Sequence, residues 1–209
     1  FLRIAGASSR GVAVVISAPL PFSGLISEVL SIMTDAMKVD HIDAILQVRL
    51  IWGICVSLFE IVHSQPSQSL VASGLVLMLL KHLSGQPRIV IRAAIHAVTS
   101  LSLVADLLRQ IDVGILCTIV ESVASNILRE VSEYRANKLY PIDENLVADQ
   151  LFCLLEWILA FGDCVSNDVK LMSKVCEALE CALTSVVKSD CAPKLPKKKR
   201  RSMKPLLAM

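Results

Sequence analysis

The stretch Arg49–Leu80, RLIWGICVSLFEIVHSQPSQSLVASGLVLMLL, holds two apolar segments separated by a short polar break around Pro66. In the first segment, large apolar side chains recur at steps of three and four residues, which places them on one face of an α-helix. The proline favours the end of a helix, because it lacks a backbone donor and restricts the residue before it. The stretch therefore predicts two helices joined by a tight turn. A lone pair of helices cannot bury both of its apolar faces, so further helices are needed.

The same arrangement recurs outward from this stretch, about three times at a spacing of roughly 45 residues. No segment of useful length shows the two-residue period of a β-strand. We therefore expect an all-α fold of stacked antiparallel helical hairpins, as in α-solenoids of the HEAT or armadillo kind. Residues 1–190 are expected to form this segment, with the weakest pattern in 1–38, and 191–209 to form a disordered basic tail. With their caps included, the predicted helices are Ser23–Lys38, Asp40–His63, Ser67–Leu83, Arg88–Ala105 with an interruption near Ser100–Ser102, Asp112–Ala136, Asp143–Phe161 and a last helix from Asn167 or Asp168.

Apolar stripes along these helices predict which side chains enter the core. Leu151–Phe161, LFCLLEWILAF, is apolar nearly all round, so we expect its helix to be the most enclosed and Gly162 to end it. The residues expected on the other buried stripes are Ile45, Val48, Trp52, Cys55, Phe59 and Val62; Val71, Leu75 and Met78; Leu116, Val120, Val123, Ile127, Val131 and Tyr134; and Met172, Val175, Leu179, Leu183 and Val186.

High hydropathy raises the question of a membrane span. The chain has 209 residues, of which 54% are hydrophobic, and its mean hydropathy is +0.62. Its longest charge-free runs, Ile61–Leu80 and Gly11–Ser27, are interrupted by polar residues and prolines, whereas a spanning helix needs about 20 mostly apolar residues. We therefore expect no membrane span, and helices covered by neighbours on several sides. The chain starts at Phe1 without a signal-peptide pattern, so we expect a cytoplasmic piece of a longer protein.

The basic residues are concentrated near the end of the chain. Seven of the 21 lie within positions 194–204, and the remaining 14 stand against 19 acidic residues, which leaves a formal charge of −5. Nucleic-acid binding is therefore not expected outside the tail. The run Lys197, Lys198, Lys199, Arg200 and Arg201 is typical of a nuclear-import signal or a polyanion-binding patch. A solvated charge run without a binding role is the alternative.

No group of residues predicts catalysis, a cofactor or a metal site. The cysteines form no C-x-x-C pair, and most lie among Leu, Ile and Val, where a free thiol acts as a small hydrophobe in a reducing compartment. Gly6–Gly11 has the glycine spacing of a phosphate loop, but Val12 and Ala13 stand where lysine and a hydroxyl residue are needed. The histidines occur singly, so we expect structural or surface roles for them. These cysteines and histidines are Cys55, Cys117, Cys153, Cys164, Cys176, Cys181, Cys191, His41, His63, His82 and His96.

Two stretches resemble alpha subunits of the Ral GTPase-activating protein complex. In Arg49–Leu80 the resemblance lies in the Ile-Trp run with its following cysteine, in Val-His before the proline-containing loop, and in the aliphatic helix after it. In Leu146–Phe161, the sequence LFCLLEWILA at Leu151–Ala160 is similar to Leu-x-Cys-Leu-Leu-Asp-Trp-Ile-x-Ala in that family. The pattern of Val169–Leu183 also fits, and the similarity covers about residues 35–188.

The resemblance implies a helical scaffold upstream of a catalytic domain, in a protein that accelerates GTP hydrolysis on Ral-type small GTPases. The implied partners are a beta-type subunit of the same complex and, through the missing catalytic domain, the small GTPase. The catalytic asparagine of that domain has no counterpart in this chain, so we carry over no catalytic residue and expect no enzyme activity. The alternative is an unrelated helical-repeat adaptor for protein–protein interaction that the basic tail directs to the nucleus.

Overall fold

The structure, a computed structural model, describes residues 23–37, 42–64, 69–136 and 143–190. Every regular element in these ranges is a helix, so the prediction of an all-α fold is confirmed. A short 3₁₀ turn, η2 (Ser102–Val104), links two of the helices. The α-helices are α2 (Ser23–Ala36), α3 (Ala44–Ser64), α4 (Ser69–Lys81), α5 (Arg88–Leu101), α6 (Ala105–Ile111), α7 (Val113–Ala136), α8 (Glu144–Asn167) and α9 (Val169–Asp190).

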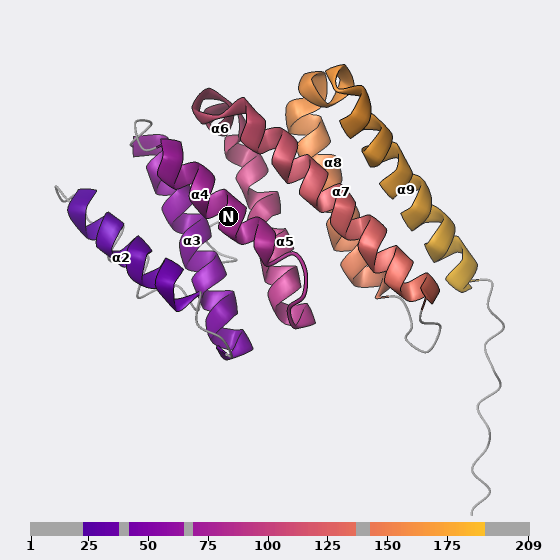
Figure 1. Ribbon diagram of the computed structural model, residues 1–209, viewed down its shortest axis with the longest axis horizontal. Coiled ribbons are helices and arrows are strands. Elements are labelled where there is room, and N and C mark those ends of the chain that lie inside the picture. Colours follow the sequence, from indigo (N-terminus) through magenta and orange to yellow (C-terminus); the bar gives the residue numbers. More distant parts are fainter. Residues whose placement is uncertain (1–22, 38–41, 65–68, 137–142, 191–209) are drawn as a thin grey trace, which may run out of the picture.

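The helices lie in two layers (Figure 1). In one layer α5 packs between α3 and α8, and in the other α7 packs along α9 and, less extensively, against α4. Contacts of α4 with α3 and α5, and of α8 with α7 and α9, join the layers. At one end α2 packs against α3, where the side chain of Met33 lies over Gly53. A Cβ atom at Gly53 would collide with the Met33 methyl group, so the glycine permits this close approach.

Aspartates cap several of these helices by accepting N–H groups of the first turn. Three of the caps were expected from the sequence and are confirmed. For α3 the sequence favours Asp40, which lies outside the described residues, whereas the observed cap is Asp43, whose Oδ2 accepts from Ile45 N at 3.1 Å. The capping aspartates are Asp43 in α3, Asp112 in α7, Asp143 in α8 and Asp168 in α9.

The helix ends agree with the sequence in part. Gly85 adopts a left-handed conformation with φ of 68° after α4, and α5 starts directly after Pro87, as expected. The predicted interruption near Ser100–Ser102 is the 3₁₀ turn, but the chain continues beyond it as α6. The predicted helix end at Gly162 is confirmed in part: helical geometry breaks at the preceding residue, Phe161 (φ −140°, ψ 24°), and a further helical stretch then continues α8 to Asn167.

The core contains the predicted stripe of α7, since its members from Leu116 to Val131 are buried and Tyr134 packs at the edge. In α3 the predicted Cys55 and Val62 are buried, but Ile45 is exposed. The buried face is turned so that Ile51, Ile54 and Leu58 are fully buried. In α4, Val71 is also exposed instead of buried. Each of these two helices packs against several other helices. The side chains that these neighbours cover are therefore not all on the expected stripe.

The prediction that Leu151–Phe161 is the most enclosed stretch is wrong. Phe152, Leu155 and Leu159 are 56%, 50% and 73% exposed, respectively. The opposite face of α8, which includes Trp157, packs against α5, α7 and α9. No described helix covers the face that carries the three exposed residues, because α8 is the last member of its layer within the described ranges.

The predicted stripe of α9 is also displaced. Met172 and Leu183 are 39% and 60% exposed, although Val175 is buried as expected and Leu179 is partly buried. Small side chains, Ala178 and Ala182, occupy the buried face instead. Small residues at a helix contact allow the two axes to approach, and Ala178 and Ala182 share the buried face of α9 with the larger Leu171 and Val175. The side chain of Val186 lies outside the described part of the chain.

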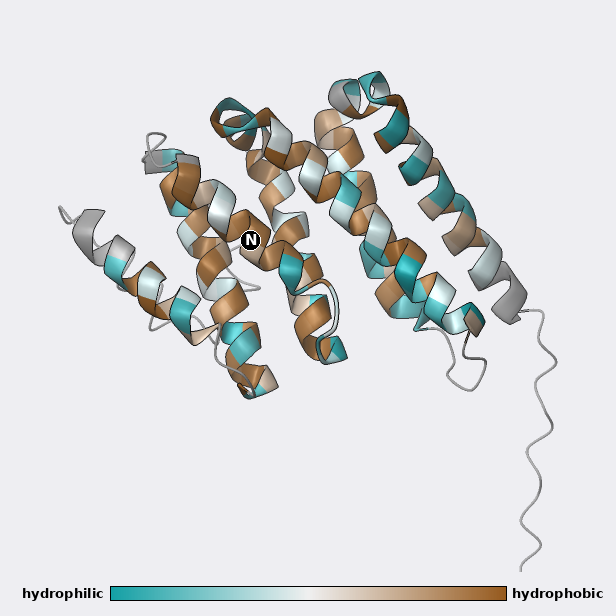
Figure 2. Cartoon of the chain, in the orientation of Figure 1, coloured by the Kyte–Doolittle hydropathy of each residue, from teal (hydrophilic) through white to brown (hydrophobic). Residues whose placement is uncertain are grey.

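Within the described part of the chain, three helical stretches are long and apolar enough to cross a membrane by length and composition. They are Ala44–His63, Arg88–Ile111 and Glu144–Asp163, of which 44%, 50% and 39% are buried in the fold. All three belong to the layer of α3, α5 and α8, or to the continuation of α5 into α6. Figure 2 shows more hydrophilic residues along the visible sides of α7 and α9 than along α4. The absence of a membrane span stays a prediction.

Candidate interaction surface

A row of exposed side chains runs along α8. It consists of Ala148, Phe152, Leu155 and Leu159, and we call it the α8 seam. Steps of four, three and four residues place these positions on one face of the helix, and all of them precede the kink at Phe161. Large apolar side chains that adjoin one another in solvent typically mark a protein or membrane contact. The α8 seam is therefore the candidate functional surface of the described chain.

One edge of the α8 seam is acidic. Asp149 and Glu156 stand seven residues apart, two helical turns, so they share that edge. Asp149 Oδ2 lies 3.2 Å from Arg92 Nε of α5 and 3.9 Å from His96 Nε2. Within the described ranges, no ion pair or hydrogen bond engages the carboxylate of Glu156. Glu156 thus adds an uncompensated negative charge beside the seam.

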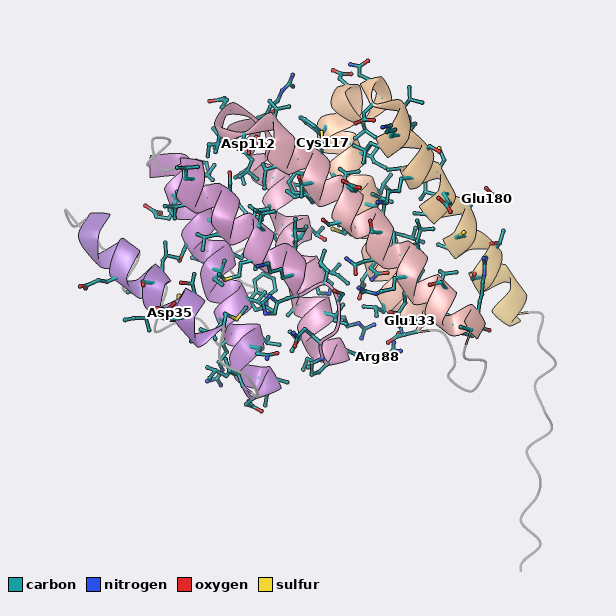
Figure 3. The ribbon with its side chains drawn as sticks, in the orientation of Figure 1. Asp35, Arg88, Asp112, Cys117, Glu133 and Glu180 are labelled. Atoms are coloured by element: carbon teal, nitrogen blue, oxygen red, sulfur yellow. The ribbon has the colours of Figure 1, made fainter. Side chains whose placement is uncertain are left out.

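Ion pairs tie the start of α8 to α5. Arg88 Nη1 donates to Asp143 Oδ2 at 2.8 Å, and Arg88 Nη2 lies 3.6 Å from Glu130 Oε1 of α7. Arg92 Nη2 is 4.0 Å from Asp143 Oδ1. Figure 3 places Arg88 at the same end of the molecule as Glu133 of α7. The network orients α8 on α5 and so sets the direction in which the seam faces.

The pKa of Asp143 is lowered below its ordinary value of 3.8. Partial burial by itself raises the pKa, but the hydrogen bond from Leu146 N and the charge and hydrogen bond of Arg88 outweigh it. The Coulombic attraction of Arg92 acts in the same direction as Arg88. The ionised carboxylate is therefore favoured in the folded chain.

We expect Asp143→Ala to lower the free energy of unfolding at neutral pH by about 0.5–2 kcal/mol, the usual loss for a helix N-cap. Because the folded-state pKa is lowered, the stabilisation is complete above the unfolded value of 3.8 and is lost as the pH falls through the folded value. Urea titrations of both proteins across this range measure the difference. Glu180→Gln, at an exposed carboxyl of α9, is the control. Equal losses in both variants, or a constant difference through the acid range, would contradict the assignment.

The cysteines fall into buried and exposed groups. Burial raises the pKa of the Cys55 thiol to about 12, and Sγ of this residue donates to Ala97 O at 3.6 Å. Burial raises the pKa of Cys153 to about 12 as well, with Glu156 adding to the effect and a hydrogen bond with Thr99 opposing it. Cys176 is exposed, whereas Cys117 and Cys181 are partly buried. The side chain of Cys164 and residue Cys191 lie outside the described part.

We expect iodoacetamide to modify Cys176 in the native protein at neutral pH and to leave Cys55 and Cys153 unmodified. The thiolate is the reactive form, and both buried thiols are protonated and shielded from solvent. Mass spectrometry of digests made after native labelling, and after labelling in urea, provides the comparison. Native labelling of Cys153 as fast as of Cys176 would show that α8 does not pack on α5 as described.

Cavities lined by described residues lie near two helix contacts. One of ≈ 370 Å³ lies between α7 and α9, and its lining includes Arg129, Arg135 and Glu177. The other, of ≈ 210 Å³, lies beside the end of the seam and is lined by Arg109, Leu159 and Asp163 among others. Arg109 stands 5.7 Å from the ring centroid of Phe161, over its face. In the larger cavity, Ser132 Oγ donates to the backbone oxygen of Arg129 at 2.8 Å.

The residues considered as sites from the sequence do not converge. Among the described residues, no group of three or more His, Cys, Asp or Glu side chains could hold a metal ion. His82 is buried, and its Nδ1 lies 2.9 Å from Met78 O, which can only accept, so Nδ1 carries the proton. His41, Gly6–Gly11 and the basic run Lys197–Arg201 lie outside the described residues. The seam was missed because its residues were assigned to the core, although their heptad-like spacing was visible in the sequence.

Comparisons of the chain with known protein families, with curated proteins and with solved structures find no match.

Proposed function

We propose that the chain is a non-catalytic scaffold that binds other proteins through the exposed apolar face of α8. The observation that carries the proposal is the α8 seam, with Phe152, Leu155 and Leu159 at least half exposed on one helix face. Exposing this much adjoining apolar surface is unfavourable in water unless a partner covers it.

The arrangement of the helices supports the finer proposal of a HEAT- or armadillo-like α-solenoid segment. Two layers in which each helix contacts its layer neighbours, as α5 contacts α3 and α8, are what stacked antiparallel hairpins produce. In such an array each repeat covers one apolar flank of the next, as α5 covers one flank of α8. The layer position of α8 agrees with this arrangement.

The partner proposal rests on the resemblance to alpha subunits of the Ral GTPase-activating protein complex. On this proposal the chain is the helical region upstream of the catalytic domain, acts in the cytoplasm in small-GTPase signalling, and associates with a beta-type subunit. It contributes position and subunit contact, while GTP hydrolysis is accelerated by a domain outside this sequence.

Co-expression of the chain with a beta-type subunit, followed by affinity purification, tests the proposal. We expect a stoichiometric complex that the double variant Phe152→Ser/Leu159→Ser weakens, while Leu77→Ser on the exposed side of α4 leaves it intact. Flanking genomic sequence without a GTPase-activating domain would end the family proposal. A nuclear distribution that is lost on deletion of Lys197–Arg201 would favour the import-directed adaptor instead.

A further inference from the structure

The spacing of the α8 seam suits one kind of partner structure. Ala148, Phe152, Leu155 and Leu159 follow the alternating four- and three-residue steps of coiled-coil core positions. Side chains in this pattern insert between the side chains of a second helix that runs alongside. A peptide that binds by strand addition would instead need a free sheet edge, and no strand occurs in the described ranges.

The charges of α8 restrict that partner further. Within Glu144–Asn167 there are four acidic residues, Glu144, Asp149, Glu156 and Asp163, and no lysine, arginine or histidine. Arg92 and His96 of α5 lie beside Asp149 and offset its charge. Glu156 lies next to the seam without such a partner, and Asp163 lines the small cavity at its end together with Arg109. Set against Arg92 and Arg109, the three acidic residues Asp149, Glu156 and Asp163 leave a net negative charge along the seam.

We propose that the α8 seam binds an amphipathic helix of a partner protein whose apolar stripe is bordered by lysine or arginine on the side that meets Glu156. The inference rests on the proposed scaffold function and specifies the chemistry of its partner. Basic side chains on the incoming helix complement the acidic edge, as charged residues do beside a coiled-coil core. A second copy of α8 would bring like charges together, and an anionic lipid surface would be repelled by the same carboxylates.

Fluorescence anisotropy with the full chain and two synthetic peptides tests the proposal. Each labelled peptide has about 18 residues, five helical turns, with leucines at heptad core positions. One carries lysine along the edges of the stripe, and the other carries glutamate at the same positions. We expect the lysine peptide to bind at least about tenfold more tightly, with the difference reduced by salt.

Substitutions in the chain test whether the peptides bind at α8. Leu155→Ser/Leu159→Ser should reduce binding of the lysine peptide by at least about tenfold. The charge reversal Glu156→Lys/Asp163→Lys should transfer the preference to the glutamate peptide. Leu77→Ser, at a 44% exposed leucine of α4, is the matched control and should bind as the parent does. Because the substituted leucines are exposed, unchanged thermal melting is expected and confirms that each variant folds.

Equal binding of both peptides, or an equal loss in Leu77→Ser, would overturn the inference. So would a dimer in light scattering that Leu155→Ser/Leu159→Ser dissociates, because the occupant would then be a second copy. Binding to phosphatidylcholine–phosphatidylserine vesicles that requires the same leucines would identify a membrane as the occupant and also overturn it. Co-purification with a beta-type subunit without peptide binding would leave the scaffold function standing. Binding of the lysine peptide without a complex with a beta-type subunit would contradict the Ral-type partner proposal and leave the helix-binding inference standing.

Discussion

Replacing Trp157 with alanine is expected to lower the free energy of unfolding by about 3–5 kcal/mol. Trp157 is the largest of the fully buried side chains and lies on the face of α8 that packs against α5. Its truncation removes a large apolar area and leaves a cavity that neighbouring helices can close only in part. The indole Nε1 also donates to Val98 O of α5 at 3.1 Å, so the residue joins the two helices by a hydrogen bond as well as by packing.

Two further variants test how much of this loss comes from the indole hydrogen bond and how much from the burial of the side chain. Trp157→Phe keeps much of the ring volume but removes the donor to Val98, so we expect a smaller loss, of about 1–2 kcal/mol. Phe152→Ala lies five residues away on the same helix, where the ring is 56% exposed, and should change stability by less than about 0.5 kcal/mol. Urea unfolding followed by circular dichroism measures all three. A Phe152→Ala loss as large as that of Trp157→Ala would mean that the helix faces are assigned incorrectly.

Replacing Ala182 with leucine is expected to destabilise the chain by about 1–3 kcal/mol. Ala182 is fully buried on the face of α9 that packs along α7, and a larger side chain would force the two helices apart. The reverse change at the next residue, Leu183→Ala, is expected to be nearly neutral, within about 0.5 kcal/mol, because Leu183 is 60% exposed.

For this pair of variants, the structure and the sequence pattern predict opposite results. The apolar stripe predicted for α9 places Leu183 in the core and does not include Ala182, so the pattern alone favours the opposite order of effects. Thermal and urea unfolding of the two proteins decide between the assignments. A larger loss for Leu183→Ala than for Ala182→Leu would place the large residues against α7 and contradict the packing of α9.

The misassigned faces of α8 and α9 have different physical causes. In α9, hydropathy gives weight to large side chains, whereas the contact with α7 uses Ala178 and Ala182, whose small size permits close approach. In α8, apolar residues lie on every side of the helix, so the sequence does not show which side packs against another helix. Phe152 and Trp157 are both large aromatic residues in the same apolar stretch, yet one is exposed and the other is fully buried.

The α8 seam likewise combines features that are visible in the sequence with features that depend on tertiary contacts. The heptad-like spacing of Phe152, Leu155 and Leu159, and the seven-residue separation of Asp149 from Glu156, are properties of the sequence. Their exposure is not, because it depends on α5 covering one flank of α8 while no described helix covers the other. The ion pair of Arg88 with Asp143 joins residues 55 positions apart and likewise has no local signal.

Local chemistry accounts for what could be predicted from the residues: the helices, the aspartate caps at Asp112, Asp143 and Asp168, the left-handed turn at Gly85, and the core stripe of α7. Each depends on atoms within a few positions along the chain, or on an apolar face with polar residues opposite it. The order of helices within the layers, the buried arc of each helix and the uncovered face of α8 depend on contacts between distant segments. Hydrophobic burial is non-directional, so it requires a covered face but does not specify which neighbour covers it.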